Sequence, residues 1–491
     1  MLDYLLLKSG RTTTLKRRGF LKGMAWLSAS LAVPKLLERD AHGQSVSPKS
    51  PDSRAIYISG LQLPSDEMGT YYQLTYQASQ AKCELQVDAQ YTLWVPAGLK
   101  RVRSVIVHQH GASILAAQGG STAAYDLHWQ ALANKWDSVL LGPSYHVLND
   151  DIGLTPGGAE LWFDPRLGSE ATFLKALGDF ARMASLPEIA TSPWCLWGHS
   201  AGGIWANVMA TLHPDRVAAM WLRSGTAAMF RTRAEFHQPE VPRALCEIPM
   251  MTNAGILEKT RGPWQGSIDT FQEYRTKGAA IGFAPDPRSA HFCGDSRYVA
   301  IPFMNACMAM RLPEVGSISA KLRPVDMSRA WLATLGATEA FPAKEYRGDA
   351  MTAIWLPDES VARKWMDYVQ TGTVADSSKP PAPINVRVSA DSGGGNVITW
   401  NAEADLESGL GAFVVMRDGR GLARLPERPP DRLFGRPLYL GLSFHDTPEA
   451  PLLPMRYLDS ATTPNVKHIY TVVALSSSGV ASDLSAPGNV Q

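Results

Sequence analysis

Short apolar runs alternate with stretches of helical periodicity along residues 55–375. Apolar residues recur at helical spacing in the longer stretches, whereas the runs have the length of buried strands. This alternation predicts an α/β fold with a mostly parallel sheet covered on both faces, and it places ligand chemistry at the carboxyl ends of the strands. The expected strands are 71–78, 90–98, 104–113, 138–145, 194–198, 217–225, 248–255 and 280–285, and the expected helices are 123–136, 169–185, 201–213 and 268–279.

The pattern changes after residue 375. TVADSSKPPAP (373–383) has the composition of an extended, semi-rigid Ser/Pro linker, and short β-rich runs without helical periodicity follow it. We therefore expect an α/β domain over residues 55–375 and an all-β sandwich over residues 376–491. Residues 311–372 lie beyond the predicted sheet and receive no role.

Composition and charge narrow the class of protein. The chain has 491 residues, of which 45% are hydrophobic and 19% charged, so it is globular and has two or three domains. Its net charge is +1, without a block of like charge. This balance gives no reason to expect a nucleic-acid partner or a basic membrane patch, and it favours neutral substrates.

The N-terminal residues have the layout of an export signal. A basic segment, KRRGFLKG (16–23), precedes a short apolar run, MAWLSASLAV (24–33), and the small residues AHG (41–43) follow. Arg17-Arg18 and the residues after them resemble the twin-arginine export motif, although Lys16 stands where that motif has Ser or Thr. The resemblance implies that residues 1–43 are a signal peptide read by the twin-arginine export machinery, and that the protein is periplasmic or extracellular in a bacterium. A basic helix that stays attached is the alternative, and no other stretch is long enough for stable membrane insertion.

Neither the cysteine spacing nor any familiar ligand-binding motif gives a reason to expect a cofactor. The chain has five cysteines and no CxxC spacing, so zinc is not expected and at least one thiol is unpaired within the chain. Disulfide pairing among the cysteines other than Cys195 stays open. No metal cluster, phosphate loop or dinucleotide fingerprint occurs.

The strongest chemical signal is WCLWGHSAGGIWA (194–206). Gly198, Ser200 and Gly202 match G-x-S-x-G, the nucleophile elbow, between an apolar strand and a helix start rich in small residues. A serine held on such a strained turn needs small neighbours so that the strand and the helix can approach each other. This context predicts that Ser200 is a nucleophile.

Residues 70–310 resemble the α/β-hydrolase family, whose catalytic groups follow the order Ser, Asp/Glu, His. Glu258 lies three residues after Gly255 at the end of an expected strand, as the family's acid does, and Asp269 and Asp286 are the competing acids. His291 follows the last expected strand and occupies the position of the family's histidine. The resemblance thus implies a Ser200–His291–Glu258 triad.

The resemblance also suggests an oxyanion hole. His110-Gly111 ends a strand like the family's oxyanion loop, so backbone N–H groups of Gly111 or Ala112 are expected to act with that of Ala201. His199, at the x position of the elbow, is expected to point away from Ser200 and to be structural. His445 and His468 lie in the second domain and are set aside.

Aromatic residues supply the candidates for a substrate-lining surface. Tyr145, Trp129 and Trp264 are named as lining, with burial in the core as the equal alternative. The segment between residues 225 and 247 is short for a lid, which would leave the site open to bulky or polymeric esters.

The second domain resembles a fibronectin type III module. PAPINVRVSA (381–390) precedes NVITWNA (396–402), whose Trp400 stands where that family keeps a core tryptophan, and IYTVVALSSSGVAS (469–482) resembles its late strand. Residues 420–465 are longer and richer in proline than the usual connections. The domain could attach a substrate or serve as a spacer, and a spacer is favoured.

Together these resemblances imply an exported serine hydrolase that cleaves small-molecule or polymeric carboxylic esters through an acyl-enzyme. Secreted esterases of the polyhydroxybutyrate-depolymerase and feruloyl-esterase group are the most similar in layout. An exported peptidase of the same fold, or a non-catalytic binding protein on a hydrolase scaffold, are the alternatives.

Overall fold

The computed structural model describes ten ranges of the chain between Ala55 and Gly488. The expected signal peptide, residues 1–43, lies outside the described residues. The described ranges are 55–56, 67–81, 83–112, 120–146, 162–232, 239–314, 321–430, 432–451, 455–462 and 466–488.

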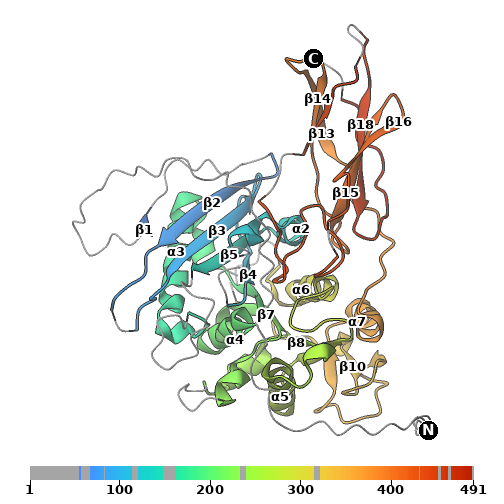
Figure 1. The fold of residues 1–491 in the computed structure, drawn as a ribbon. Helices are drawn as coiled ribbons and strands as arrows, with labels where there is room; N and C mark the ends of the chain where they lie inside the picture. Colours follow the sequence, from blue (N-terminus) through green and yellow to red (C-terminus); the bar gives the residue numbers. More distant parts are fainter. Residues whose placement is uncertain are drawn as a thin grey trace, which may run out of the picture. The chain divides into compact units, whose positions relative to one another are not determined.

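A nine-stranded mixed sheet is the centre of the α/β domain, with strand order β1-β2-β3-β5-β4-β6-β7-β8-β9 (Figure 1). The strands from β1 to β5 pair antiparallel, and those from β5 through β4 to β9 pair parallel. The crossover of β4 and β5 puts β4 beside β6, where the chain reverses its direction of travel across the sheet. The bounds are β1 (Ala55–Ile56), β2 (Gly69–Tyr76), β3 (Asp88–Pro96), β4 (Ser104–Gln109), β5 (Ser138–His146), β6 (Trp194–His199), β7 (Val217–Arg223), β8 (Met250–Gly255) and β9 (Ile281–Asp286).

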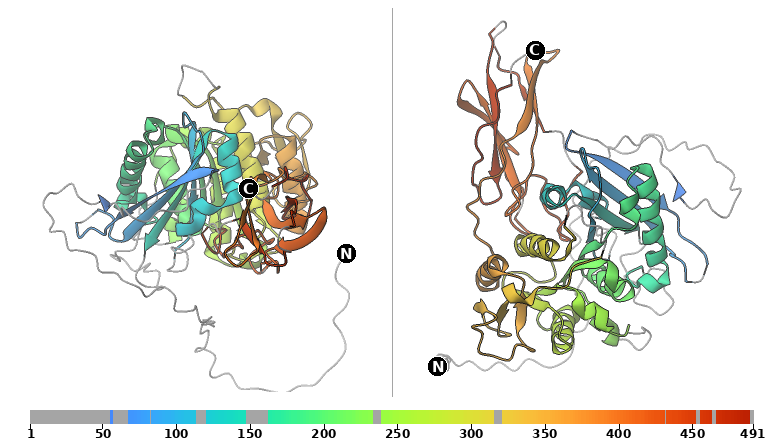
Figure 2. Two further views of the ribbon diagram at one scale, coloured as in Figure 1. Left: turned by 90° about the horizontal axis from the view of Figure 1, so that it is seen from above. Right: turned by 180° about the vertical axis from the view of Figure 1, so that it is seen from behind.

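Helices cover both faces of this sheet. Helices α3, α4 and α5 pack on one face, and α2, α6 and α7 pack on the other (Figure 2). The parallel strands β4, β6 and β7 are buried along their whole length, which explains their unbroken apolar sequences. The bounds are α2 (Leu127–Lys135), α3 (Ser169–Met183), α4 (Ala201–Leu212), α5 (Gly262–Thr276), α6 (Arg297–Arg311) and α7 (Glu359–Thr371).

The segment without a predicted role folds against the edge of the sheet. Three short strands, β10 (Trp331–Ala333), β11 (Ala340–Pro342) and β12 (Ile354–Leu356), form a small antiparallel sheet, and α7 follows. Asp358 begins α7 by accepting the N–H of Val361, and Gly372 ends it in the left-handed region with φ 70°. The segment therefore extends the α/β domain rather than linking it to the next one.

The C-terminal residues form a fibronectin III-like β domain with two antiparallel three-stranded sheets. Trp400 is buried and packs on Phe413 with ring centroids 5.4 Å apart, in the core position that the sequence predicts. The sheets contain β13 (Ile384–Ala390), β14 (Asn396–Asn401) and β17 (Arg456–Asp459), and β16 (Arg420–Leu425), β15 (Leu410–Arg417) and β18 (Tyr470–Ser476).

This β domain shares a hydrophobic core with the α/β domain. Leu127 and Ala131 of α2 belong to the same buried cluster as Trp400 and Phe413. The β domain therefore packs on the α/β domain, a contact that a spacer does not require. The fold class is as predicted from the sequence: an α/β-hydrolase sheet covered on both faces, followed by an all-β sandwich.

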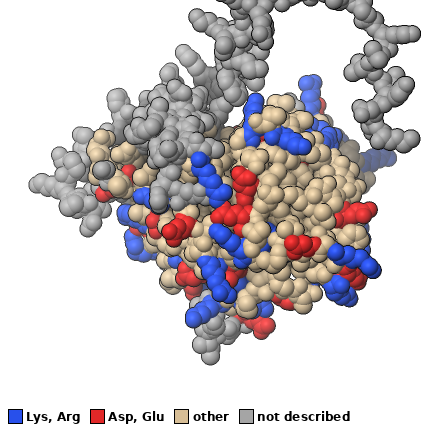
Figure 3. Space-filling view, turned by 90° about the horizontal axis from the view of Figure 1, so that it is seen from below, with Lys and Arg blue, Asp and Glu red and all other residues tan. Residues whose placement is uncertain are grey.

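Other sequence expectations concern thiols, membranes and charge. All five cysteines are free thiols. Within the part of the chain that the structure describes, no helix has the length and apolar character needed to cross a membrane. On the face in Figure 3, Lys and Arg side chains lie among Asp and Glu side chains across the described residues.

Candidate active site

Ser200 lies on the sharp turn between β6, which ends at His199, and α4, which begins at Ala201. Its backbone has φ 54° and ψ −120°, a conformation that non-glycine residues rarely adopt. The N–H of Ser200 is held by the carbonyl of Arg223 at the end of β7, 2.7 Å away. The neighbouring strand therefore fixes a strained turn that presents the serine hydroxyl.

Glycines make this turn possible because backbone segments meet there. A Cβ on Gly198 would lie 2.2 Å from the carbonyl oxygen of Gly202, and a Cβ on Gly202 would lie 2.3 Å from that of His110. Gly225 is still closer, because its Cβ would lie 1.8 Å from the carbonyl oxygen of Ser200. The two glycines of the motif thus match the close packing that the sequence analysis expects of them.

His291 and Glu258 form a hydrogen-bonded chain with Ser200. Nε2 of His291 lies 2.9 Å from Oγ of Ser200, and Nδ1 lies 2.8 Å from Oε2 of Glu258. A carboxylate only accepts hydrogen bonds, so Nδ1 of neutral His291 carries the proton and Nε2 offers its lone pair to the serine hydroxyl. The structure therefore brings the three predicted residues together in the arrangement of a nucleophile, a base and an orienting acid.

Glu258 is fully buried and stays ionised. Burial alone would raise the pKa of its carboxyl group, but hydrogen bonds from His291 and Ser224 and the charge of Arg223 bring that pKa below its usual value. It follows β8 in a short 3-10 turn, Ile256–Glu258. The competing acids lie elsewhere: Asp269 accepts from Gln265 on an exposed part of α5, and Asp286 accepts the N–H of Arg288.

The oxyanion-hole candidates surround the serine. Ala201 is the first residue of α4, so its N–H lacks an intrahelical partner and lies at the positive end of the helix dipole. A Cβ on Gly111 would lie 3.2 Å from Cβ of Ser200, which places the loop after β4 directly beside the nucleophile. Ala112 is the next residue of that loop.

His110 fixes the orientation of this loop. Its Nε2 accepts the N–H of Tyr145 at 3.1 Å, so its Nδ1 carries the proton and donates to the carbonyl of Gly111 at 2.5 Å. Burial lowers the pKa of His110 to about 3, which keeps the ring neutral. In a trans peptide the N–H points opposite to the carbonyl. The N–H of Ala112 therefore points away from His110.

The aromatic residues named as substrate lining are in the core instead. Trp129 is completely buried against the ring of His108, Tyr145 stacks on Trp162 at 4.5 Å, and Trp264 packs edge-on against Phe283. That part of the prediction is wrong because core and pocket aromatics look alike in sequence.

His445 of the β domain, set aside in the sequence analysis, also lies at this site. A Cβ on Gly111 would be 3.0 Å from the His445 ring, and Nδ1 of His445 lies 2.7 Å from Nδ1 of His199. His199 is structural, as expected, since it is buried and its Nε2 lies 2.7 Å from the carbonyl of His291. No local motif marks His445, which is 246 positions from His199.

The sheet order, the strained serine between β6 and α4, and the chain order Ser200, Glu258, His291 define an α/β-hydrolase fold. No protein-family model matches the sequence, and no curated protein matches it either.

Solved structures resemble parts of the chain. The S-formylglutathione hydrolase from Agrobacterium tumefaciens is 18% identical, with 51% of this chain and 96% of that chain covered and a TM-score of 0.35. A ferulic acid esterase is 15% identical, with 45% and 91% covered and a TM-score of 0.31. An Fn3-like protein from Clostridium thermocellum is 22% identical, with 23% and 94% covered and a TM-score of 0.16. These values are low, so the fold assignment rests on the sheet order and the elbow.

Proposed function

We propose that the protein is a serine hydrolase that cleaves carboxylic esters through Ser200, His291 and Glu258. The observation that carries this proposal is the unbroken hydrogen-bond chain from the serine hydroxyl through the imidazole to a buried carboxylate, at 2.9 and 2.8 Å. The strained conformation of Ser200 supports it, because such strain is concentrated at functional positions.

The geometry gives each group a defined task. Oγ of Ser200 attacks the carbonyl carbon of the ester while Nε2 of His291 takes the hydroxyl proton. The π electrons of the carbonyl group move onto its oxygen, which becomes an oxyanion. N–H groups of Ala201 and of the Gly111–Ala112 loop stabilise that oxyanion, each by on the order of 3 kcal/mol. The intermediate then collapses, the alcohol leaves with the proton from His291, and water hydrolyses the acyl-enzyme by the same steps.

Glu258 acts through His291. Its carboxylate holds the Nδ1–H tautomer and stabilises the imidazolium that forms during the attack. The hydroxyl of Ser224 and the N–H of Gly255, at 2.5 and 3.4 Å, both point to its other oxygen. This carboxylate is therefore fixed before a substrate arrives.

Ser200→Ala tests the proposal directly. The wild-type protein is expected to hydrolyse a p-nitrophenyl ester and to be labelled by a fluorophosphonate, and Ser200→Ala is expected to lose both. Ser267→Ala is a matched control, since Ser267 is a buried serine that donates to the carbonyl of Pro263 within α5. Labelling of Ser200→Ala at the wild-type rate would refute the assignment.

A panel of aryl, acetyl, feruloyl and polyester substrates then identifies the ester class. Hydrolysis of peptides with no ester hydrolysis would instead identify a peptidase of this fold. Binding of a glycan or peptide by a wild-type protein that neither turns over nor is labelled would identify a binding protein.

We also propose that the protein is exported through the twin-arginine machinery, on the strength of Arg17-Arg18 and the apolar run after it. Changing both arginines to lysine should leave the protein in the cytoplasm of a bacterial host, as measured by fractionation and immunoblotting. Equal export of the two forms would refute this signal.

A further inference from the structure

The connection between β16 and β17 leaves the β sandwich and reaches the active site. We call residues 432–448 the β16–β17 segment. It belongs in sequence to the β domain, yet Phe444 and His445 lie beside His199 of the elbow, with ring centroids 5.7 and 4.8 Å from it. A domain that merely carried the enzyme would have no reason to place side chains there.

A buried ion network anchors this segment. Arg297 of α6 lies between Asp126, at the start of α2, and Asp446 of the segment, with N–O distances of 2.7 and 2.8 Å. All three side chains are almost completely buried, and Arg297 also donates to the backbone carbonyl of Asp446 at 2.8 Å. Moving one of these groups away would leave an uncompensated buried charge, which is strongly unfavourable, so the three groups stay in one arrangement. Here the arrangement they fix is the position of residue 446, next to His445.

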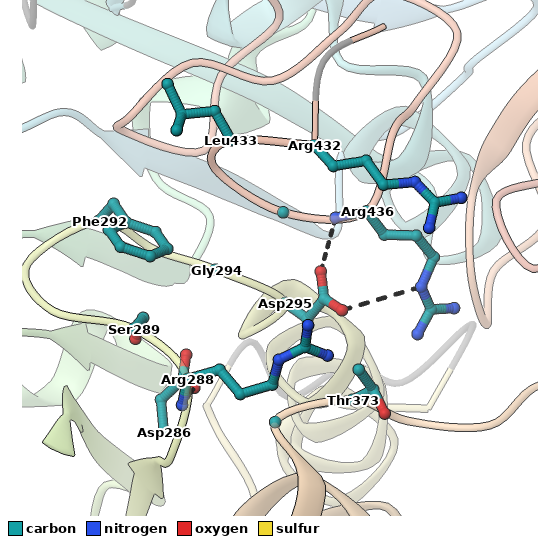
Figure 4. A pocket seen from close by; sticks show the side chains of 12 residues that line it. Asp286, Arg288, Ser289, Phe292, Gly294, Asp295, Thr373, Arg432, Leu433 and Arg436 are labelled. Atoms are coloured by element: carbon teal, nitrogen blue, oxygen red, sulfur yellow. Dashed lines mark hydrogen bonds and ion pairs between the residues drawn. The ribbon is translucent and has the colours of Figure 1, made fainter. Parts of the chain in front are cut away.

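Further contacts hold the same segment. Thr122 donates to the carbonyl of Pro448 at 2.6 Å. Asp295 accepts the N–H of Arg436 at 2.7 Å (Figure 4). The guanidinium of Arg436 also lies over the ring of Tyr298, 4.1 Å from its centroid. A cavity of about 260 Å³ beside the contact between Asp295 and Arg436 is lined by residues of both domains. The segment is therefore attached to the α/β domain at several points.

The hydrogen bonds of His445 form a chain that ends at the catalytic histidine. Nε2 of His199 must donate to the carbonyl of His291, since a carbonyl only accepts. Burial lowers the pKa of His199 well below its usual value, so the ring is neutral and its Nδ1 is an acceptor. Nδ1 of His445, 2.7 Å away, must then carry a proton and donate it. Two acceptors facing each other at that distance would repel.

His445 and Phe444 touch the site at two further places. A Cβ added to Gly111 would lie 3.0 Å from the His445 ring and 3.2 Å from Cβ of Ser200. The oxyanion loop is thus held between His445 and the nucleophile. The centroid of the Phe444 ring lies 6.1 Å from that of the His291 ring.

We propose that the β domain completes the active site, and that His445 is a positioning residue that holds the His291 backbone through His199 and the oxyanion loop through Gly111. This inference rests on the proposed function, because it assigns His445 a part in the reaction of Ser200. The β domain is on this view a component of the enzyme and not a separate attachment module.

Two isosteric variants of the full-length protein test the role of His445. His445→Asn places an amide N–H where Nδ1 lies and preserves the donor to His199, whereas His445→Gln places it near the position of Nε2 and does not. We expect His445→Gln to lose at least tenfold in kcat with little change in KM, and His445→Asn to keep most of the wild-type kcat. His468→Ala is the matched control, since this histidine of the β domain is bonded to Asp418 within that domain. Equal kcat for the Asn and Gln variants would overturn the proposal.

A second measurement does not depend on ester hydrolysis. Nitrogen-detected NMR of the histidine rings, assigned by comparison with His445→Asn, should show His445 as the neutral Nδ1–H tautomer, which is the less common one in solution. Finding the Nε2–H tautomer would overturn the proposal. Failure of the proposed function looks different: the wild-type protein would be inert to every ester and to a fluorophosphonate, whatever residue 445 is.

Discussion

Ser224 donates its hydroxyl hydrogen to Oε1 of Glu258 across 2.5 Å, while His291 is bonded to Oε2 of the same carboxylate. Ser224 follows β7, has a positive φ of 51° and is completely buried. Ser224, directly after β7, therefore holds Glu258, which follows the neighbouring strand β8. This contact fixes the carboxylate on the side away from the histidine.

Ser224→Ala should weaken catalysis without removing it. A hydrogen bond to a charged group contributes about 1.5–3 kcal/mol, which corresponds to about 10- to 150-fold, so we expect kcat/KM to fall by at least about tenfold. The pKa of Glu258 should rise, because one of the groups that lower it is gone. The measurement is kcat/KM against pH, with Ser267→Ala as the matched control. An unchanged pH profile would show that Ser224 is only a packing residue.

Arg297→Met should destabilise the whole unit that Arg297 holds together. It leaves the buried carboxylates of Asp126 and Asp446 without their cation, and breaking a buried ion pair in this way costs about 3–5 kcal/mol. Urea unfolding followed by circular dichroism measures the loss. Arg363→Met is the comparison, since its pair with Glu359 is exposed on α7 and contributes less than about 1 kcal/mol. Equal losses in the free energy of unfolding of the two variants would contradict the stabilising role of the buried ion network.

Gly225→Ala should disrupt the elbow from outside the motif. The added methyl group would lie 1.8 Å from the carbonyl oxygen of Ser200, and backbone must move to admit it. We expect ester hydrolysis to be lost, together with fluorophosphonate labelling. Gly262→Ala, at the start of α5, places its methyl group in open space and should behave as wild type. Full activity of Gly225→Ala would mean that the backbone of the turn can move to admit the methyl group without loss of catalysis.

The elements and site residues that the sequence could predict are those marked by a pattern of neighbouring residues. Strands β2 to β9 and helices α2 to α4 lie close to the expected ranges, because burial on both faces gives parallel strands continuous apolar sequences. Helix α5 begins at Gly262 and not at residue 268, and α6, α7 and β10 to β12 have no counterpart among the expected elements. Ser200 and Glu258 each follow a strand at a fixed spacing, so short motifs located them, and His291 was found by its place after the last strand. The structure brings these three side chains together.

The remaining features depend on contacts between distant parts of the chain. Asp126 and Arg297 are 171 positions apart, and His199 and His445 are 246 apart, so no local spacing indicates either pair. Trp129 and Trp264 failed as lining residues for another reason. A large aromatic side chain lowers the free energy by burial in a core and in a pocket alike, and only the packing tells them apart.

Acid should unfold the protein at a pH where most carboxylates are still ionised. Burial lowers the pKa of His110 and His445 to about 3 and that of His128 to about 4. In the unfolded chain each has its usual value of about 6.5. Between these values the unfolded chain binds protons that the folded protein does not. The stability is therefore complete above about pH 6.5 and is lost as the pH falls towards the folded values.

His128→Gln separates the titration from the packing. Nε2 of His128 donates to the carbonyl of Leu406 at 2.8 Å, and glutamine keeps an N–H at that position but does not titrate. The free energy of unfolding at pH 8 should therefore change little. Between about pH 4 and 6 its slope should fall by about 1.4 kcal/mol per pH unit, the contribution of one proton. Urea unfolding of both proteins at a series of pH values measures the slopes. The same slope in both would mean that His128 is already protonated in the folded protein, and that its burial does not oppose the charge.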